Sequence, residues 1–275
     1  STEAQELFND GVAYDATTHS KSANLIGYWR NDGVTTWKDR GGIPEATFNG
    51  TSAFIDCGGD IDEVGAFSIS LWFNADTFSS SPRNFAHQGT GFFGTSYNTQ
   101  GKLMYQGQGS GANNLETQTV LSTGVWHHAV LTVSGTNAGD GAIYVNGSRD
   151  DDGASTSFMN AGNFIIGKNP DASNRYFDGK MAQVAIFNRA LSASEVNVIY
   201  NLGQVGADIS SYSGLKGYWF LDGSHANPDN SGSDKVLDRS GNDNHGTLTD
   251  VVLTGNNDGT VSGSPDSITI REGLN

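Results

Sequence analysis

Aromatic and amide side chains alternate through one loop-rich segment of the chain, residues 92–114. Aromatic rings stack on the C–H faces of sugars, and Asn, Asp and Gln side chains hydrogen-bond sugar hydroxyl groups. The segment therefore predicts a carbohydrate-binding surface. The alternative for each ring is a place in the core, which is the commoner position of aromatic residues in β proteins. The candidate glycan-binding residues are Trp37, Phe93, Tyr97, Asn98, Tyr105, Gln106, Gln108 and Asn113.

A second group of candidates consists of Asp and Asn residues in turn-like segments. Calcium takes six to eight oxygen ligands, which carboxylates, side-chain amides and backbone carbonyls supply from loops. Because the acidic residues are mostly Asp, a structural calcium ion is one expectation. The alternative is that these side chains hydrogen-bond their own turns. The candidate ligands are Asp238, Asn242 and Asn244, followed by Asp178 and Asp39.

Carboxylate pairs for glycoside hydrolysis are not evident in the sequence. A retaining glycosidase needs two carboxyl groups about 5 Å apart, and an inverting one needs a wider pair. Asp60, Asp62 and Glu63 come nearest, but they fall in a glycine-flanked loop before a predicted strand. We therefore expect no catalytic residues and no enzyme activity.

The histidines offer no metal site by their spacing. His127 and His128 follow one another on a predicted strand, where successive side chains point to opposite faces, so they cannot share one site. His87 and His245 fall in predicted loops without a ligand partner at a useful distance along the chain.

Composition excludes several function classes. The net charge is −15, and the 15 Lys and Arg residues are scattered, so the basic clusters that neutralise nucleic-acid phosphates are missing. Cys57 is the single cysteine, which excludes an intrachain disulfide and a zinc site built from thiolates. No apolar run approaches the roughly 20 residues of a membrane-spanning helix. We expect neither nucleic-acid binding nor membrane insertion.

Short strands bounded by turn residues must position these candidates. In residues 67–73, apolar side chains alternate with Ser, and the pair Asn146-Gly147 is the preferred two-residue hairpin turn. Ser192 and Glu195 form a capping-box signature, which predicts a helix near residues 192–201. Short strands at this spacing indicate a β-sandwich or barrel. The further predicted strands are 126–133, 142–145, 164–166 and 180–187.

The chain also repeats itself. An opening motif, Leu-x-Gly-Tyr-Trp, occurs at residues 25–29 and again at residues 215–219, and an Asp-Arg pair follows each copy, at Asp39-Arg40 and Asp238-Arg239. Such self-similarity is typical of a tandem array. We expect residues 1–22 to be the tail of a preceding repeat plus a linker, and 23–203 to be one complete domain. Residues 204–275 are then a linker and a partial second repeat that packs on the first.

The ordered motifs resemble those of a known family. They are Gly27-Tyr28-Trp29, the strand from Phe67 to Phe73, residues 126–130, residues 143–147, and residues 177–192 with Phe177-Asp178-Gly179 at their start. Together they resemble a laminin-G-like domain of the concanavalin A-like lectin/glucanase superfamily. The resemblance implies an all-β, two-sheet antiparallel jelly-roll sandwich with one short helix. It also raises the expectation of a structural calcium ion.

The resemblance further implies a non-enzymatic binding module. Its expected partner is a polysaccharide or cell-surface glycan, or other virion or adhesin subunits, and its expected location is extracellular or on a virion. The tandem arrangement resembles that of structural and tail-fibre proteins of marine bacteriophages. Two alternatives stay open: a structural spacer or assembly domain without a ligand, and a polysaccharide hydrolase or lyase of the same fold.

Overall fold

The computed structural model describes residues 45–59, 61, 65–79, 81–97, 99–107, 114–154, 157–203, 209–221 and 235–254. All of them belong to one compact unit, residues 40–258. The second unit, residues 1–39 with 259–275, lies outside the described residues. Within the described part of the chain, no helix is long and apolar enough to span a membrane.

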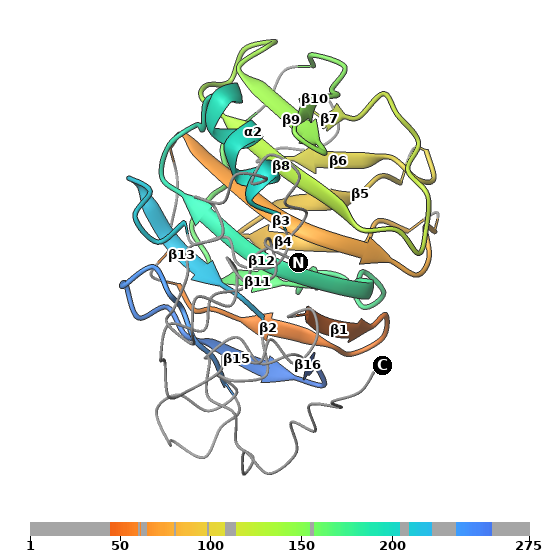
Figure 1. Ribbon diagram of the computed structural model, residues 1–275. Helices are drawn as coiled ribbons and strands as arrows, with labels where there is room; N and C mark the ends of the chain where they lie inside the picture. The colour runs from red at the N-terminus through yellow and green to blue at the C-terminus, as the bar shows by residue number, and fades with distance from the viewer. Residues whose placement is uncertain are drawn as a thin grey trace, which may run out of the picture. The chain divides into compact units, whose positions relative to one another are not determined.

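The first of two antiparallel sheets carries eight strands (Figure 1). They are β1 (Glu45–Asn49), β3 (Phe67–Ala75), β8 (His127–Val133), β9 (Gly141–Val145), β10 (Ser148–Arg149), β12 (Asp178–Phe187), β13 (Leu215–Trp219) and β16 (Val252–Thr254). Their order is β10-β9-β8-β3-β12-β1-β16, and β13 also pairs with β12.

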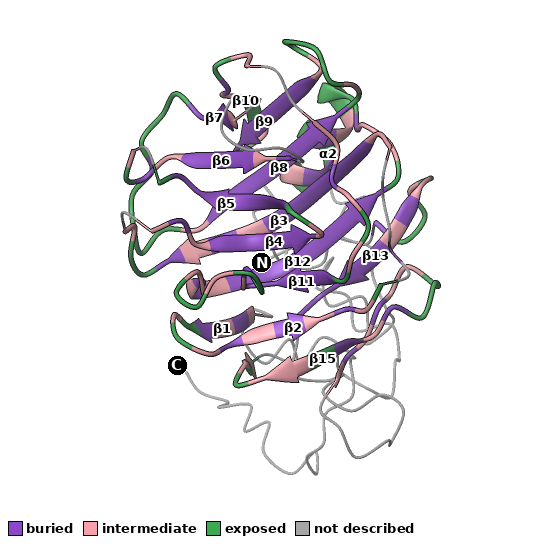
Figure 2. Ribbon diagram, turned by 180° about the vertical axis from the view of Figure 1, so that it is seen from behind, coloured by how far each residue is buried: buried purple, intermediate pink, exposed green. Residues whose placement is uncertain are grey.

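The second sheet also has eight strands and faces the viewer in Figure 2. They are β2 (Phe54–Asp56), β4 (Asn84–Gln88), β5 (Gly91–Thr95), β6 (Leu103–Gln106), β7 (Asn114–Glu116), β11 (Phe164–Ile166), β14 (Lys235–Val236) and β15 (Gly246–Thr249). Their order is β14-β15-β2-β11-β4-β5-β6-β7. The predicted two-sheet antiparallel sandwich is confirmed.

The main core lies between the two sheets. Phe85 is at its aromatic centre, with ring centroids 4.5 Å from Phe73, 5.3 Å from Phe177 and 5.7 Å from Phe93. Fully burying one such side chain contributes about 1.5–3 kcal/mol to folding. Inward residues of both sheets alternate with outward ones, as the period of two residues in a strand requires.

A second, smaller core lies on the outer face of the first sheet, under helix α2 (Ala193–Leu202). The predicted capping box begins the helix: the Ser192 side chain accepts from the Glu195 N–H, and the Glu195 carboxylate accepts from the Ser192 N–H. Val196 and Ile199 pack against the sheet beside Phe187. The helix ends before Gly203, whose φ of 76° suits glycine.

Strands from the second copy of the repeat belong to the same sandwich. β13 and β16 join the first sheet, and β14 and β15 join the second. Trp219 of β13 is fully buried in the main core. The segment predicted as a partial second repeat thus supplies edge strands to both layers. The strand-like tail at residues 267–271 lies outside the described residues.

Candidate functional site

One line of side chains crosses the outer face of the second sheet. Its members pair in register from β2 through β11, β4, β5 and β6 to β7. Their strand neighbours Ile55, Ile166, Phe93 and Leu115 point into the main core, so the line points away from the first sheet. We call this line the outer row; it consists of Asp56, Ile165, His87, Phe92, Gln106 and Asn114.

The connection between β11 and β12 folds over part of the outer row. A bridge between Lys168 and Tyr176 closes the base of this loop. From it, Arg175 lies over the Phe92 ring, with 5.9 Å from the guanidinium carbon to the ring centroid. Asp171 Oδ2 lies 3.9 Å from His87 Nε2. The loop therefore brings one cation and one carboxylate to the middle of the row.

A pocket of about 430 Å³ lies beside this loop, and we call it the outer pocket. The Lys168 ammonium group lies 4.3 Å from the centroid of the Phe54 ring at its edge. Asn163 donates to both carboxylate oxygens of Asp56, at 3.2 Å each. The lining residues are Phe54, Asp56, His87, Gly89, Gly162, Asn163, Ile165, Lys168 and Pro170.

Several buried polar atoms on this sheet have no hydrogen-bond partner among the described residues. They include Nδ1 of His87 and both amide atoms of Asn84, on the strand that borders the pocket. Asn84 is fully buried and lies opposite Gly94, which has no side chain to bond it. Leaving one such group unsatisfied costs about 1–3 kcal/mol, so a water molecule or other polar group that reached one of these atoms would be stabilising.

His87 is neutral at physiological pH. The pKa of His87 is lowered from 6.5 to about 4, and burial is the largest cause. The negative charge of Asp171 opposes this shift, and the positive charge of Arg175 adds to it. A neutral imidazole has one nitrogen that donates and one that accepts a hydrogen bond. His87 can therefore bond a neutral hydroxyl group without carrying a charge.

Two candidate glycan-binding residues need a correction. Phe93 and Tyr105 are fully buried between the sheets, because their positions on β5 and β6 alternate inward. The Tyr105 hydroxyl donates to the carbonyl oxygen of Ser157 at 2.5 Å. Neither ring offers a face to a sugar at the surface.

Two further candidates do lie on the outer face. Gln106 belongs to the outer row, and the Tyr97 hydroxyl accepts a hydrogen bond of 2.6 Å from Asn114. Tyr97 is 36% exposed. The candidates Trp37, Asn98, Gln108 and Asn113 lie outside the described residues.

The first-choice calcium ligands form a closed hydrogen-bonded turn instead. Asp238 Oδ1 accepts from the N–H groups of Tyr218 and Ser240, and Oδ2 accepts from the Ser240 hydroxyl and the Asn244 N–H. The side-chain amides of Asn242 and Asn244 donate to the Lys216 carbonyl oxygen. Donors occupy the carboxylate positions that a cation would need, so this turn does not fit calcium.

The other calcium candidates are Asp178 and Asp39. Asp178 Oδ2 accepts a hydrogen bond from the Thr77 hydroxyl, and Asp39 lies outside the described residues. Within the described ranges, no group of three or more His, Cys, Asp or Glu side chains could hold a metal ion.

A family model described as "Concanavalin A-like lectin/glucanases superfamily" matches residues 48–197, which is more than half of the chain. The chain belongs to this superfamily. The match covers most of both sheets, including every strand of the outer row. The comparison with curated proteins found no match.

Solved structures agree on the superfamily fold. A proposed carbohydrate-binding protein from Bacteroides ovatus superposes with a TM-score of 0.59 and 21% sequence identity, over 78% of this chain and 60% of the other. This chain thus spans less than two thirds of that protein. A heptameric SAP-like pentraxin from Limulus polyphemus superposes with a TM-score of 0.50 and 14% identity, over 77% of this chain and 94% of the other.

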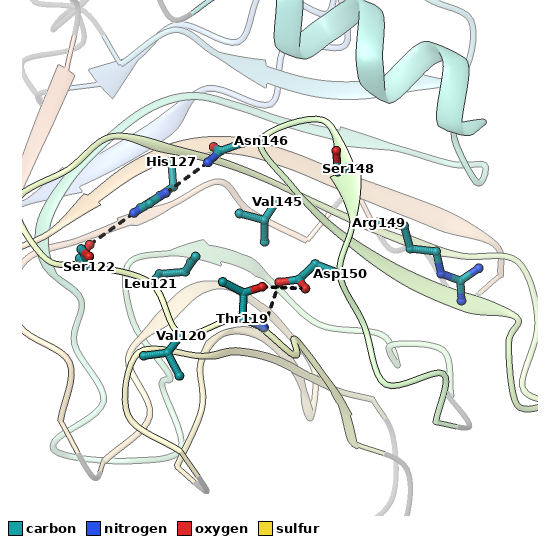
Figure 3. Close-up of a pocket in the computed structure, with 10 residues that line it drawn as sticks. All are labelled: Thr119, Val120, Leu121, Ser122, His127, Val145, Asn146, Ser148, Arg149 and Asp150. Carbon is teal, nitrogen blue, oxygen red and sulfur yellow. Dashed lines mark hydrogen bonds between the residues drawn. The ribbon is translucent and has the colours of Figure 1, made fainter.

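This superfamily member has a second pocket of about 400 Å³, between the loop before β8 and the β9–β10 hairpin (Figure 3). Its polar side chains bond one another. Thr119 donates to Asp150 through its hydroxyl and backbone N–H groups, and His127 bonds the Ser122 carbonyl and the Asn146 amide. In contrast to the outer pocket, these bonded walls leave little for a ligand to satisfy.

A third pocket, of about 450 Å³, surrounds Arg83 at the rim of the sandwich. The Arg83 Nη1 atom donates to the carbonyl oxygens of Gly50, Asn174 and Tyr176, at 3.0–3.3 Å. This cation therefore holds loops together.

The paired histidines point to opposite faces, as predicted. The His127 ring lies 5.6 Å from the core residue Phe73, and the His128 ring lies 5.0 Å from Trp72 on the other face. His87, predicted in a loop, lies on β4 instead. A register shift between Asn84 and Ala86 breaks the alternation that would have revealed this strand.

Proposed function

We propose that this chain is a non-catalytic carbohydrate-binding module, and that a glycan binds along the outer row with the outer pocket as its deepest part. The observation that carries the proposal is the lining of the outer pocket, which combines the Phe54 ring and Lys168 with His87, whose Nδ1 atom is unsatisfied among the described residues. Sugar hydroxyl groups both donate and accept hydrogen bonds, so they suit an amide and a neutral imidazole alike.

The rest of the outer face supplies the other contacts of a sugar site. The Phe54 ring lines the pocket and can stack on a sugar C–H face, while Lys168 can donate to a ring or hydroxyl oxygen. Gln106, Asn114 and the partly exposed Tyr97 continue the surface toward the other edge of the sheet. The β11–β12 loop covers the middle of the row, so a glycan would contact it at the outer pocket and near Gln106 and Asn114.

The chemistry of the pocket supports binding over cleavage. Asp56 is the one carboxylate among the described residues that line it, and hydrogen bonds from Asn163 and Gly58 fix its oxygens. Glycoside hydrolysis uses two carboxyl groups on either side of the scissile bond. The outer pocket is therefore better suited to bind a sugar than to cleave one.

The proposal includes a setting. A module that attaches to a polysaccharide or cell-surface glycan acts outside the cell or on a virion, and the repeated opening motif fits a tandem adhesin or bacteriophage tail protein. The Bacteroides ovatus protein of the same fold is itself proposed to bind carbohydrate. A spacer or assembly domain without a ligand is the rival, and it predicts no glycan affinity.

A glycan array with the full chain tests the proposal, run with calcium and again with a chelator. We expect reproducible binding to one glycan class that Phe54→Ala abolishes. Val120→Ala, in the pocket of Figure 3, serves as the matched control and should bind like the unaltered chain. Absence of binding by a folded protein would favour the spacer function. Binding that is lost on chelation would show that a cation takes part, which the site proposed here does not include.

A further inference from the structure

Three cationic side chains meet on the connection between β11 and β12. The Arg83 guanidinium group donates to the backbone carbonyl oxygen of Tyr176 at 3.0 Å. The Lys168 ammonium group lies 5.3 Å from the centroid of the Tyr176 ring. Arg175, the residue before Tyr176, lies over the Phe92 ring of the outer row. All three cations are partly exposed and surround one short segment, and we call them the cationic cluster.

The cationic cluster forms no salt bridge within the described part of the chain. The carboxylates around it contact other neighbours: Asp56 accepts from Asn163, Asp171 approaches His87, and Asp178 accepts from Thr77. Unpaired cations are unexpected in this protein, because its 30 acidic residues outnumber its 15 Lys and Arg residues. The cluster therefore leaves three positive charges available to an anionic ligand.

The pocket around Arg83 has the chemistry of an anion site, and we call it the rim pocket. Among the described residues, no Asp or Glu lines it. Hydroxyl groups and guanidinium N–H groups both donate hydrogen bonds to oxyanions. The rim pocket is therefore positive and rich in donors, in contrast to the outer pocket. Its hydroxyl-bearing residues are Thr51, Ser79, Ser81, Ser173 and Tyr176.

Arg83 is held in place with one nitrogen atom left over. Its Nε atom donates to Ser79 Oγ at 3.2 Å, and its Nη1 atom donates to three backbone carbonyl oxygens. Its Nη2 atom, which carries two of the five N–H donors, makes no hydrogen bond within the described residues. Because the guanidinium group is already oriented, an oxyanion that bonds Nη2 orders little that is not ordered before binding.

The rim pocket and the outer pocket are neighbours. Lys168 lines the outer pocket, Tyr176 lines the rim pocket, and these two residues form the bridge at the base of the β11–β12 loop. The turn that starts at Gly50 lines the rim pocket, and Phe54 of the following strand lines the outer pocket. A polymer that occupies the outer pocket can therefore continue into the rim pocket past Lys168 and Tyr176.

We propose that the glycan bound by this chain is an acidic polysaccharide, whose carboxylate or sulfate groups contact the cationic cluster and enter the rim pocket. This inference rests on the proposed carbohydrate-binding function and adds the class of ligand. Hydroxyl groups of one sugar unit bond the outer pocket, and an anionic group of the same or the next unit reaches Arg83. The contact between opposite charges also makes binding sensitive to salt.

Titration of the full chain with two matched pairs of polymers tests the ligand class. The first pair is polygalacturonate and its methyl-esterified form, and the second is dextran sulfate and dextran. The members of each pair share a sugar backbone and differ in the anionic group. We expect the anionic member of at least one pair to bind about tenfold more tightly, which also separates carboxylate from sulfate recognition. Raising NaCl from about 0.05 M to about 0.3 M should weaken this binding severalfold.

A variant of the cluster tests where the anionic polymer binds. Arg175→Gln removes one charge at a guanidinium group that makes no hydrogen bond within the described ranges, so it should weaken binding about tenfold without lowering the Tm. The matched control is Arg239→Gln, whose guanidinium group lies over the Phe220 ring, beside β13. It removes the same charge and should bind as the unaltered chain does.

The possible failures of this test differ from one another. Equal binding of both members of each pair, or binding of a neutral array glycan with neither anionic polymer, would overturn the acidic-ligand inference and leave the carbohydrate-binding function intact. Binding of no polymer and no array glycan would overturn both. Equal weakening in Arg175→Gln and Arg239→Gln would also overturn the inference, because net charge and not the cationic cluster would then determine binding.

Discussion

The Oγ atom of Ser70 lies 3.0 Å from Nε2 of His128, beneath helix α2. His128 is 1% exposed, and its Nδ1 atom has no hydrogen-bond partner among the described residues. The rings of Trp72 and Tyr200 flank the imidazole, with centroids 5.0 and 5.9 Å away. A neutral ring that donates from Nε2 leaves one buried acceptor, Nδ1, without a partner, whereas a protonated ring would place a buried positive charge and an N–H without an acceptor there.

Stability should therefore fall as the pH falls. Burial lowers the pKa of His128 from 6.5 to about 3 in the folded protein. Between these two values the unfolded chain binds a proton that the folded chain does not, so the free energy of unfolding decreases as pH drops below about 6.5. From pH 7 to pH 5, this one residue costs about 2 kcal/mol. Chemical denaturation at the two pH values measures the loss.

Variants separate His128 from the other groups. His87, whose pKa is also lowered, adds to the loss in the unaltered protein. His128→Gln should reduce the pH dependence by about 2 kcal/mol over this range. His245→Gln, at a partly exposed histidine, is the control and should retain it. An unchanged pH dependence in His128→Gln would show that the buried ring is not responsible.

The turn between β1 and β2 depends on one side chain. Asn49 Oδ1 accepts from the backbone N–H groups of Thr51, Ser52 and Ala53, at 2.9–3.0 Å. Asn49→Ala removes all three bonds and should lower the free energy of unfolding by about 1–2 kcal/mol. Asn49→Asp keeps the acceptor and should restore most of it, as measured by urea denaturation. Equal losses in both variants would contradict this role.

The N-terminus of α2 offers a further test of stability. Ser192 accepts from the Glu195 N–H, and the Glu195 carboxylate accepts from Ser192 while it pairs with Arg189 at 2.6 Å. Ser192→Ala should lower the free energy of unfolding by about 1 kcal/mol, whereas Ser192→Asp should keep the cap. Thermal denaturation followed by circular dichroism checks both. A loss of equal size in Ser192→Asp would mean that the helix does not depend on the capping bond.

Local patterns predicted the sandwich well because its strands alternate cleanly. The alternation from Phe67 to Phe73, the Asn146-Gly147 turn and the Ser192–Glu195 capping box each depend on neighbours within a few residues. Patterns of this kind can be recognised in the sequence without knowledge of the fold. They predicted four of the eight strands of the first sheet (β3, β8, β9 and β12), strand β11 of the second sheet and the helix, close to their positions in the structure.

The candidate site was harder to predict because its residues come together only across strands. Phe93 and Tyr105 stood in an aromatic, amide-rich segment, yet the strand period turns both inward. His87 reaches the outer row through a strand whose bulge hides the alternation. Lys168 reaches Phe54 from a loop more than a hundred residues away in sequence. No local pattern encodes a pairing of that kind.

Lys168 is the cation that lines the outer pocket, and we expect glycan binding to depend on it. Lys168 lies 4.3 Å from the Phe54 ring centroid and 5.3 Å from that of Tyr176, and it forms no salt bridge within the described residues. Its ammonium group is thus available to a sugar oxygen. For the glycan identified on the array, Lys168→Ala should weaken binding by about tenfold to a hundredfold, because a hydrogen bond to a charged group contributes about 1.5–3 kcal/mol. Isothermal titration calorimetry measures the change.

The matched control is Lys102→Ala, at a lysine that directly precedes β6 and does not line the outer pocket. This variant should bind as the unaltered chain does. If both variants weaken binding equally, the effect is one of net charge, and the glycan does not contact Lys168.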